Sequence, residues 1–349
     1  MDLYWLALPF LPRIGNQTWM KLLNHFGSPK EIFSVPAKEL KFFGLHEETI
    51  KIIISGQWKK KAEALFKKIK NLGLEIITYN DDKYPKLLKE IFDPPLILYI
   101  KGNKDLLNTT CIAIVGTRRA SFYGIKMATK LAIGLAESGI TVVSGLARGI
   151  DAAAHKGALQ AKGKTIAVLG CGLDVIYPKE NEKLFNEIAE KGALISEFLP
   201  GTPPLAHNFP IRNRIISGLS LGVVVVEAAL KSGSLITANL ALEQGKEVFA
   251  VPGPIDESRK GTHNLLKQGA KLVEDVSDIL EEFHFYSKTV TLNLDPLQEK
   301  ILSLLDTPKT LEEIAIILNE NITNLSATLT LLEVQGLIKQ LPGKQYIKI

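Results

Sequence analysis

The stretch GVVVVEAA, residues 222–229, decides the fold. Its four consecutive valines predict a strand covered on both faces, because a strand with one exposed face alternates apolar and polar residues. Five further runs of this kind lie between residues 110 and 253: TCIAIVG, ITVVSGLA, KTIAVLGCG, ALISEF and EVFAVPG. The intervals between them suit crossover helices. The alternation predicts an α/β domain on a doubly wound parallel sheet, which binds ligands at the carboxyl ends of its strands.

The segment before this domain has a different pattern. Residues 1–72 are expected to be helical, since LPRIG with TWMKLLNHFG, and ELKFFG with LHEETIKII, resemble two copies of a helix–hairpin–helix. Such modules contact the DNA backbone or serve in packing and dimerisation, and we favour the second use here. The sheet domain is expected over residues 73–287, beginning with a strand–turn–strand extension in residues 73–105.

The last segment, residues 288–349, carries three helical patterns followed by two strands around a Pro342-Gly343 turn. This order predicts a winged helix, whose third helix often enters a DNA major groove. The third helix, residues 324–335, contains no Lys or Arg. A protein-docking role is therefore favoured, because a reader of phosphate-lined grooves needs cations.

Composition indicates a soluble, cytoplasmic protein. At 349 residues and 46% hydrophobic the chain is long enough for two or three domains with cores. Its two cysteines lie in apolar runs, which excludes a disulfide framework and favours a reducing compartment. The apolar start carries Asp2 in place of a basic region and is broken by Pro9 and Pro12, so we exclude a signal peptide. No apolar run approaches the roughly 20 residues of a membrane helix.

Arginine is unevenly distributed along the chain. Of 42 basic residues only seven are arginines, and six of these fall in the nearly neutral segment 106–289, whereas residues 1–105 carry a net charge of +5. The planar guanidinium suits phosphate and carboxylate better than the point charge of lysine does. An anion site is therefore expected in the middle of the chain.

Basic and small residues follow the predicted strands. Arg118 and Arg119 come after the first strand and Arg148 after the second, and the segment 231–234 precedes a predicted helix. Free N–H groups at a helix N-terminus bind anions. Each arginine alone is more often a loop salt bridge, but together they predict a basic groove at one edge of the sheet. The chain has no Walker loop, no GxGxxG and no convincing catalytic, cofactor or metal motif.

The segment NFPIRNRIISGLS, residues 208–220, precedes the valine strand. With Pro210 in a first helical turn, Ile211, Ile215 and Leu219 are expected on the buried face. Arg212 and Arg214 would project about 200° apart on a helix. One is therefore expected to contact the ligand and the other to brace a loop or a carboxylate such as Glu227. Phe209 is either a core residue or a platform on which an unpaired base stacks.

These residues resemble the DNA-processing protein A family (DprA, also called Smf). The motifs that carry the resemblance span roughly residues 112–280 and include IVGTRRASFYG, VVSGLARGIDAAAHKGAL, NFPIRNRIISGLS and KSGSLITANLALEQGKEVFAVPGP. The resemblance implies an extended Rossmann-like domain that binds single-stranded DNA, an N-terminal SAM-like domain and a C-terminal winged helix. It further implies a homodimer without catalytic activity that protects incoming DNA and loads the RecA recombinase in natural transformation.

The predicted DNA-binding positions come from the matching motifs and from the strand ends. They are Arg118, Arg119, Gly145, Arg148, Asn208, Phe209, Arg212, Arg214, Lys231, Ser232, Gly233 and Ser234.

Two alternatives remain at this stage. A nucleotide-binding enzyme of the lysine-decarboxylase-like phosphoribohydrolase type would carry PGGxGTxxE at a helix N-terminus. This chain has KSGSLITA there, without the acidic end, so hydrolysis ranks lower. The other alternative is an interaction scaffold whose winged helix carries the function.

Overall fold

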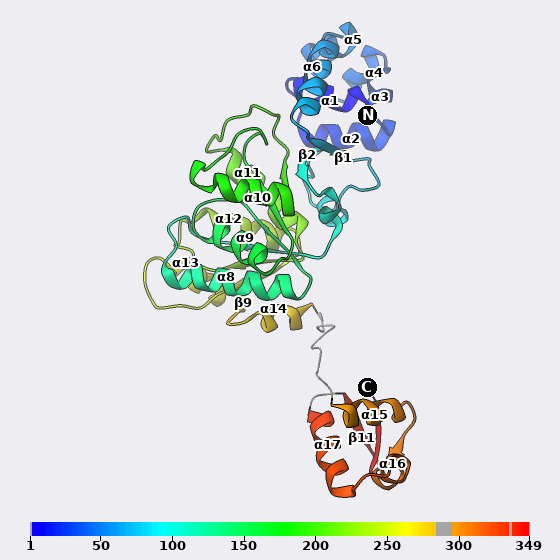
Figure 1. The fold of residues 1–349 in the computed structure, drawn as a ribbon. Coiled ribbons are helices and arrows are strands. Elements are labelled where there is room, and N and C mark those ends of the chain that lie inside the picture. Colours follow the sequence, from blue (N-terminus) through cyan, green and yellow to red (C-terminus); the bar gives the residue numbers. More distant parts are fainter. Residues whose placement is uncertain (1, 284–294, 335–336, 349) are drawn as a thin grey trace. The chain divides into compact units, whose positions relative to one another are not determined.

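The computed structural model describes residues 2–283, 295–334 and 337–348. The chain divides into two compact units, residues 1–286 and 287–349. The predicted boundary between residues 287 and 288 lies outside the described residues. Figure 1 shows the fold of each unit.

A nine-stranded sheet, counted over the described residues, is the centre of the first unit, with the order β1-β2-β6-β5-β4-β3-β7-β8-β9. From β6 to β9 all neighbouring strands are parallel. All six predicted strands are present: β3 (Cys111–Val115), β4 (Thr141–Ser144), β5 (Thr165–Val168), β6 (Ala193–Ser196), β7 (Gly222–Val225) and β8 (Glu247–Ala250), followed by β9 (Lys271–Leu272). The expectation of a doubly wound parallel sheet is confirmed.

The predicted extension adds two antiparallel strands to the sheet. β1 (Glu75–Thr78) pairs with β2 (Ile97–Gly102), and β2 pairs with β6. The short helix α7 (Lys86–Lys89) lies between β1 and β2 in the chain. Through this hairpin the sheet meets the N-terminal helices.

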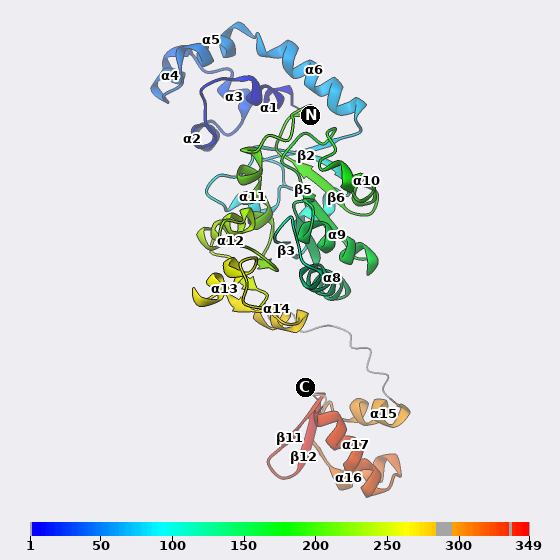
Figure 2. The ribbon, with the colours of Figure 1, turned by 90° about the vertical axis from the view of Figure 1, so that its left-hand side faces the viewer.

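Helices cover both faces of the sheet, as Figure 2 shows for α8 and α9 on one side and α11 and α12 on the other. The first layer contains α8 (Phe122–Glu137), α9 (Ile150–Gln160), α10 (Glu182–Lys191) and α14 (Val276–Glu282). The second contains α11 (Asn208–Leu219), α12 (Gly233–Glu243) and α13 (Lys260–Lys267). The chain leaves the adjacent strands β3 and β7 in opposite directions, toward β4 and toward β8. Crevices in doubly wound sheets form at such a switch point.

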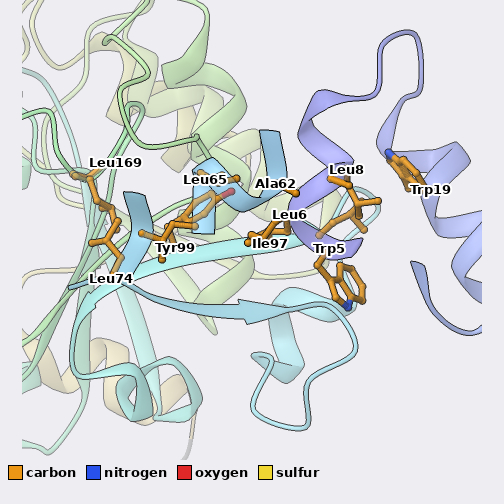
Figure 3. Packing of buried hydrophobic residues seen from close by; sticks show 14 of the residues in the cluster. Trp5, Leu6, Leu8, Trp19, Ala62, Leu65, Leu74, Ile97, Tyr99 and Leu169 are labelled. Atoms are coloured by element: carbon orange, nitrogen blue, oxygen red, sulfur yellow. The ribbon is translucent and has the colours of Figure 1, made fainter. Parts of the chain in front are cut away.

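The first 72 residues are mostly helical, as expected, and belong to the first compact unit. Its helices are α1 (Leu3–Ala7), α2 (Asn16–Phe26), α3 (Pro29–Ile32), α4 (Ala37–Phe42), α5 (Glu47–Ser55) and α6 (Trp58–Asn71). Its core around Trp5, Trp19 and Leu65 is continuous with Tyr99 of β2 and with Leu169, which follows β5 (Figure 3). These helices are therefore fixed against the sheet by apolar packing.

The second unit is a winged helix, as predicted. It contains α15 (Pro296–Leu304), β10 (Lys309–Thr310), α16 (Leu311–Leu318), α17 (Ile322–Val334), β11 (Ile338–Leu341) and β12 (Gln345–Lys348). Capping boxes begin α15 and α16, where Asp295 pairs with Gln298 and Thr310 with Glu313. In neither unit is any described helix long and apolar enough to cross a membrane.

Candidate nucleic-acid interface

A cleft of ≈ 590 Å³ opens at the switch point of the first unit. The loop after β3, the N-termini of α11 and α12 and the loops after β4, β5 and β6 all contribute to it. Its lining includes Thr117, Arg118, Arg119, Ala147, Asp151, Tyr177, Pro204, Phe209, Arg212, Asn213, Ser232, Gly233 and Ser234. Residues far apart in the chain thus converge on one cleft, as predicted from the parallel topology.

Arg118 and Arg119 supply the open positive charge of this cleft. Both side chains are exposed, and in the described part of the chain neither forms a salt bridge. The guanidinium carbon of Arg118 lies 5.1 Å from the centroid of the Phe209 ring. An unpaired guanidinium held over an aromatic face can meet a phosphate or a stacked base.

Phe209 and Tyr177 form an aromatic wall between two hollows. Their ring centroids lie 5.6 Å apart, and both line the main cleft and a second hollow of ≈ 240 Å³ beside it. A Cβ added to Gly170 would lie 2.9 Å from the Phe209 ring, so only glycine allows this ring position. Phe209 is half-buried rather than a full core residue, which leaves it a ring surface for stacking. The sequence offered no pattern from which to predict Tyr177.

The N-terminus of α12 faces the same cleft. Ser232 caps this helix: its Oγ accepts a hydrogen bond from the Ser234 N–H and lies 2.8 Å from the Ser234 Oγ. A Cβ added at Gly233 would meet no atom within 4 Å, which means that a ligand can approach the backbone there. The helix has 11 residues, so its dipole and its free N–H groups favour an anion at this end.

Lys231 lies on the other side of this helix start. It is exposed, and it lines a separate shallow hollow together with Asn239 and Asn264 rather than the main cleft. The N-terminus of α12 is thus flanked by Lys231 on one side and by the main cleft with Arg118 on the other. The prediction that Lys231 contacts DNA is compatible with this placement and stays a prediction.

Arg212 is buried, and most of its donors are used inside the protein. Its Nη1 donates to the carbonyl of Gly145 at 2.8 Å and to that of Val168, and its Nε donates to Asn213 Oδ1 at 3.2 Å. Burial lowers the pKa of Arg212 to about 10, an effect that Asp151 opposes. Arg212 therefore ties the ends of β4 and β5 together beneath the cleft.

This position of Arg212 corrects the predicted face of α11. Ile215 and Leu219 are buried as expected, but Ile211 is 46% exposed, and Arg212 points toward the sheet in its place. The physical reason is that carbonyl groups beyond the strand ends need donors, which an isoleucine cannot supply. Burial also raises the pKa of Asp151, against the field of Arg212, and its Oδ2 accepts from the Ala147 N–H.

Arg214 and Asn208 are held by hydrogen bonds within the fold, and the prediction that they contact DNA stays a prediction. Arg214 donates to both carboxylate oxygens of Glu197 at 2.6 Å and to Asp93 at 3.0 Å, and its side chain is 11% exposed. Glu197 and Asp93, not Glu227, are thus the carboxylates that it braces. The buried Asn208 donates to the carbonyls of Gly170 and Pro203. Their polar groups are satisfied locally, so neither presents a free donor to the cleft.

Arg148 and Gly145 line the smaller hollow. Arg148 is exposed and forms an ion pair with Glu180. Such a solvent-exposed ion pair contributes little to the stability of the fold. Gly145 has a steric role, because an added Cβ would lie 2.6 Å from Nη2 of Arg212.

Glu227 anchors the loop that carries Arg118 and Arg119. It is 1% exposed, its carboxylate accepts from the N–H and the hydroxyl of Ser121, and its backbone carbonyl accepts from the Thr117 N–H at 2.7 Å. Its charge partner is Arg259, 3.5 Å away and itself buried. The signal that could have indicated this role is an acid directly after four valines, where a charge must be paired.

Together the fold and the cleft define a doubly wound α/β protein with an open crevice at its switch point, lined by exposed arginines and a helix N-terminus. The family model described as DNA recombination-mediator protein A matches residues 75–284, and that of the DprA winged helix domain matches residues 287–344. The chain belongs to this family, DprA or Smf.

Relatives across bacteria support the assignment. The DNA processing protein DprA of Streptococcus pneumoniae is 52% identical over 59% of this chain and 73% of its own length. Protein Smf of Escherichia coli is 51% identical over 60% of this chain and 57% of its own length. Protein Smf of Synechocystis sp. is 34% identical over 98% of both chains.

Solved structures show the same fold. The X-ray structure of DprA from Streptococcus pneumoniae superposes with a TM-score of 0.72 at 39% identity, over 81% of this chain and 98% of that one. DNA processing protein A from Helicobacter pylori, solved for its single-stranded DNA binding mode, superposes with a TM-score of 0.55 at 36% identity, over 60% of this chain and 95% of that one.

Proposed function

We propose that this protein binds single-stranded DNA in the cleft at the β3/β7 switch point. Phosphates meet Arg118, Arg119 and the N-terminus of α12, and bases stack on Phe209 and Tyr177. The observation that carries the proposal is the juxtaposition of an unpaired guanidinium with an aromatic ring, 5.1 Å apart, in a cleft that a helix N-terminus faces. The relative from Helicobacter pylori, whose single-stranded DNA binding mode has been described, supports the choice of ligand.

The aromatic wall favours a single strand over a duplex. A base can stack on a side chain only when it is not already stacked and paired within a helix. The main contacts go to phosphates and ring faces, which every sequence presents, so the binding is expected to be largely independent of sequence.

The test is a titration of the full chain with matched single-stranded and duplex oligonucleotides over a salt series. We expect a preference for the single strand, and a slope of log affinity against log salt of about −0.7 for each phosphate neutralised. An affinity that does not depend on salt, or equal binding of duplex, would contradict the proposal.

The wider role is part of the same proposal and is supported by membership of the family. The protein acts as a homodimer that protects incoming DNA and delivers it to the RecA recombinase during natural transformation, without catalysis of its own. It should accelerate RecA assembly on single strands coated with a single-stranded DNA-binding protein. Release of free base from a nucleoside monophosphate by the pure protein would support the phosphoribohydrolase alternative and contradict this role.

A further inference from the structure

Helix α6 carries more lysines than any other described helix. Its 14 residues include six lysines and a single acid, Glu63. All six lysines are exposed. In the described residues only Lys68 among them forms a salt bridge. No carboxylate neutralises the remaining five in the described structure, although the Nζ atoms of Lys59 and Lys61 lie 5.9 and 5.8 Å from the ring centroids of Trp58 and Phe10.

α6 is fixed beside the smaller hollow of the DNA cleft. Its Leu65 belongs to the same buried cluster as Leu146, Leu169 and Cys171, which line that hollow from the other side. Figure 3 shows Leu65, Tyr99 and Leu169 in this layer of apolar side chains. The helix therefore packs behind the cleft wall within one compact unit.

An ion pair connects α6 to the loops that form the cleft. Lys68 lies 3.1 Å from Asp174, whose Oδ1 accepts from the Gly201 N–H at 2.6 Å. Asp174 lies in the loop that continues to Tyr177, and Gly201 lies in the loop that continues to Pro204. Tyr177 and Pro204 both line the main cleft. The Lys68 flank of α6 thus faces the cleft loops.

Helical spacing separates the other lysines into the two flanks and the outermost line of the helix. At about 100° per residue, Lys61 lies on the same flank as Lys68, and Lys60 and Lys67 lie along the outermost line, opposite the buried face. Lys59 and Lys70 lie on the opposite flank. That flank faces away from the cleft loops, because Lys70 lines a hollow together with Asp2, Glu75 and Asp81.

We propose that the surface of α6 from its cleft-side flank to its outermost line, with Lys61, Lys60 and Lys67, is a second phosphate-binding surface, which takes up the single strand where it leaves the cleft. The inference rests on the proposed function. Lysines are point charges on flexible stems, and they suit a mobile phosphodiester chain that needs no fixed geometry. Lys68, held by Asp174, fixes the position of the helix beside the strand.

The experiment compares two double variants of the full chain that remove equal charge from the same helix. Lys60→Gln/Lys61→Gln changes the proposed surface, and Lys59→Gln/Lys70→Gln changes the opposite flank. Each is titrated with single strands of about 6 and about 16 nucleotides, lengths within the range of known single-strand sites. The short strand fills the cleft alone, whereas the long strand can reach α6.

We expect Lys60→Gln/Lys61→Gln to weaken binding of the long strand about three- to tenfold and to reduce its salt slope by about 0.7–1.4, while binding of the short strand stays unchanged. The control variant should leave both affinities unchanged. Equal losses in the two variants, an equal loss on both lengths, or no loss on the long strand would each overturn the inference. If the unmodified protein bound neither length, the proposed function itself would fail, which is a distinct outcome.

Discussion

The carbonyl of Gly145 accepts a hydrogen bond from the buried Arg212 at 2.8 Å, and a Cβ at Gly145 would lie 2.6 Å from the same guanidinium. Gly145→Ala is therefore expected to displace Arg212 and to destabilise the first unit by about 1–3 kcal/mol. Thermal or urea unfolding measures this loss. Gly233→Ala, where an added Cβ meets nothing within 4 Å, is the control and should leave the stability nearly unchanged. Similar losses in both variants would contradict the steric role of Gly145.

Substitution of Arg118 should change the affinity for single strands, whereas substitution of Arg214 should change the stability of the fold. Arg118→Ala removes an exposed charge from the cleft, so the affinity for single strands should fall and the salt slope should decrease by about 0.7, with an unchanged melting temperature. Arg214→Ala leaves Glu197 and Asp93 without their partner and should cost about 3 kcal/mol of unfolding free energy. Paired calorimetry and fluorescence-anisotropy titrations check both. If Arg118→Ala lost stability while keeping its affinity, the assignment of the cleft would be wrong.

Phe209→Leu tests stacking independently of charge. The substitution keeps an apolar side chain but removes the ring on which a base is proposed to lie, and stacking contributes about 1–3 kcal/mol per base. The dissociation constant should rise at least about fivefold, with an unchanged salt slope. Phe122→Leu, at a phenylalanine that is 85% exposed and is not among the cleft residues, is the matched control. The loss should disappear with an abasic oligonucleotide, and a loss that persists there would argue against stacking.

His155 should make stability depend on pH. The Thr165 hydroxyl donates to the Val142 carbonyl, so the His155 Nδ1 must donate to Thr165 Oγ1, 2.7 Å away, which leaves Nε2 as a buried acceptor without a partner in the described structure. Burial, reinforced by the charge of Arg212, lowers the pKa of His155 to about 3.

The sign of the effect follows from the two states. Below the ordinary histidine pKa of about 6.5 the unfolded chain binds a proton that the folded chain does not, so stability decreases as the pH falls from 6.5 toward 3, by up to about 1.4 kcal/mol per unit. Urea unfolding at several pH values measures the slope. His155→Gln should flatten it over this window, and an unchanged slope in that variant would assign the effect to other groups.

The sheet and the helices could be predicted because their signals are local. Four valines in sequence, or apolar residues at helical spacing, describe the burial of a single element, and the six predicted strands are all present. The position of the cleft followed from topology, because parallel strands bring their carboxyl ends to one edge.

Which polar residues are buried within the fold and which are exposed in the cleft could not be predicted. Whether an arginine is open, like Arg118, or buried, like Arg212, depends on which carbonyls and carboxylates tertiary packing brings near it. Tyr177 and the Glu227–Arg259 pair were missed for the same reason, since their partners lie far away in sequence. The antiparallel pairing of β2 with β6 likewise depends on a long-range contact that no local pattern reports.

The switch between β3 and β7 has a consequence for how this protein handles its ligand. The lining of the crevice comes from segments that are far apart in the chain, among them residues 115–119 and 209–237, which only the folded sheet brings together. Binding of a nucleic acid strand must therefore stabilise the folded state of the whole first unit. A saturating oligonucleotide should slow hydrogen exchange in every strand of the sheet, including the strands at the edge far from the crevice.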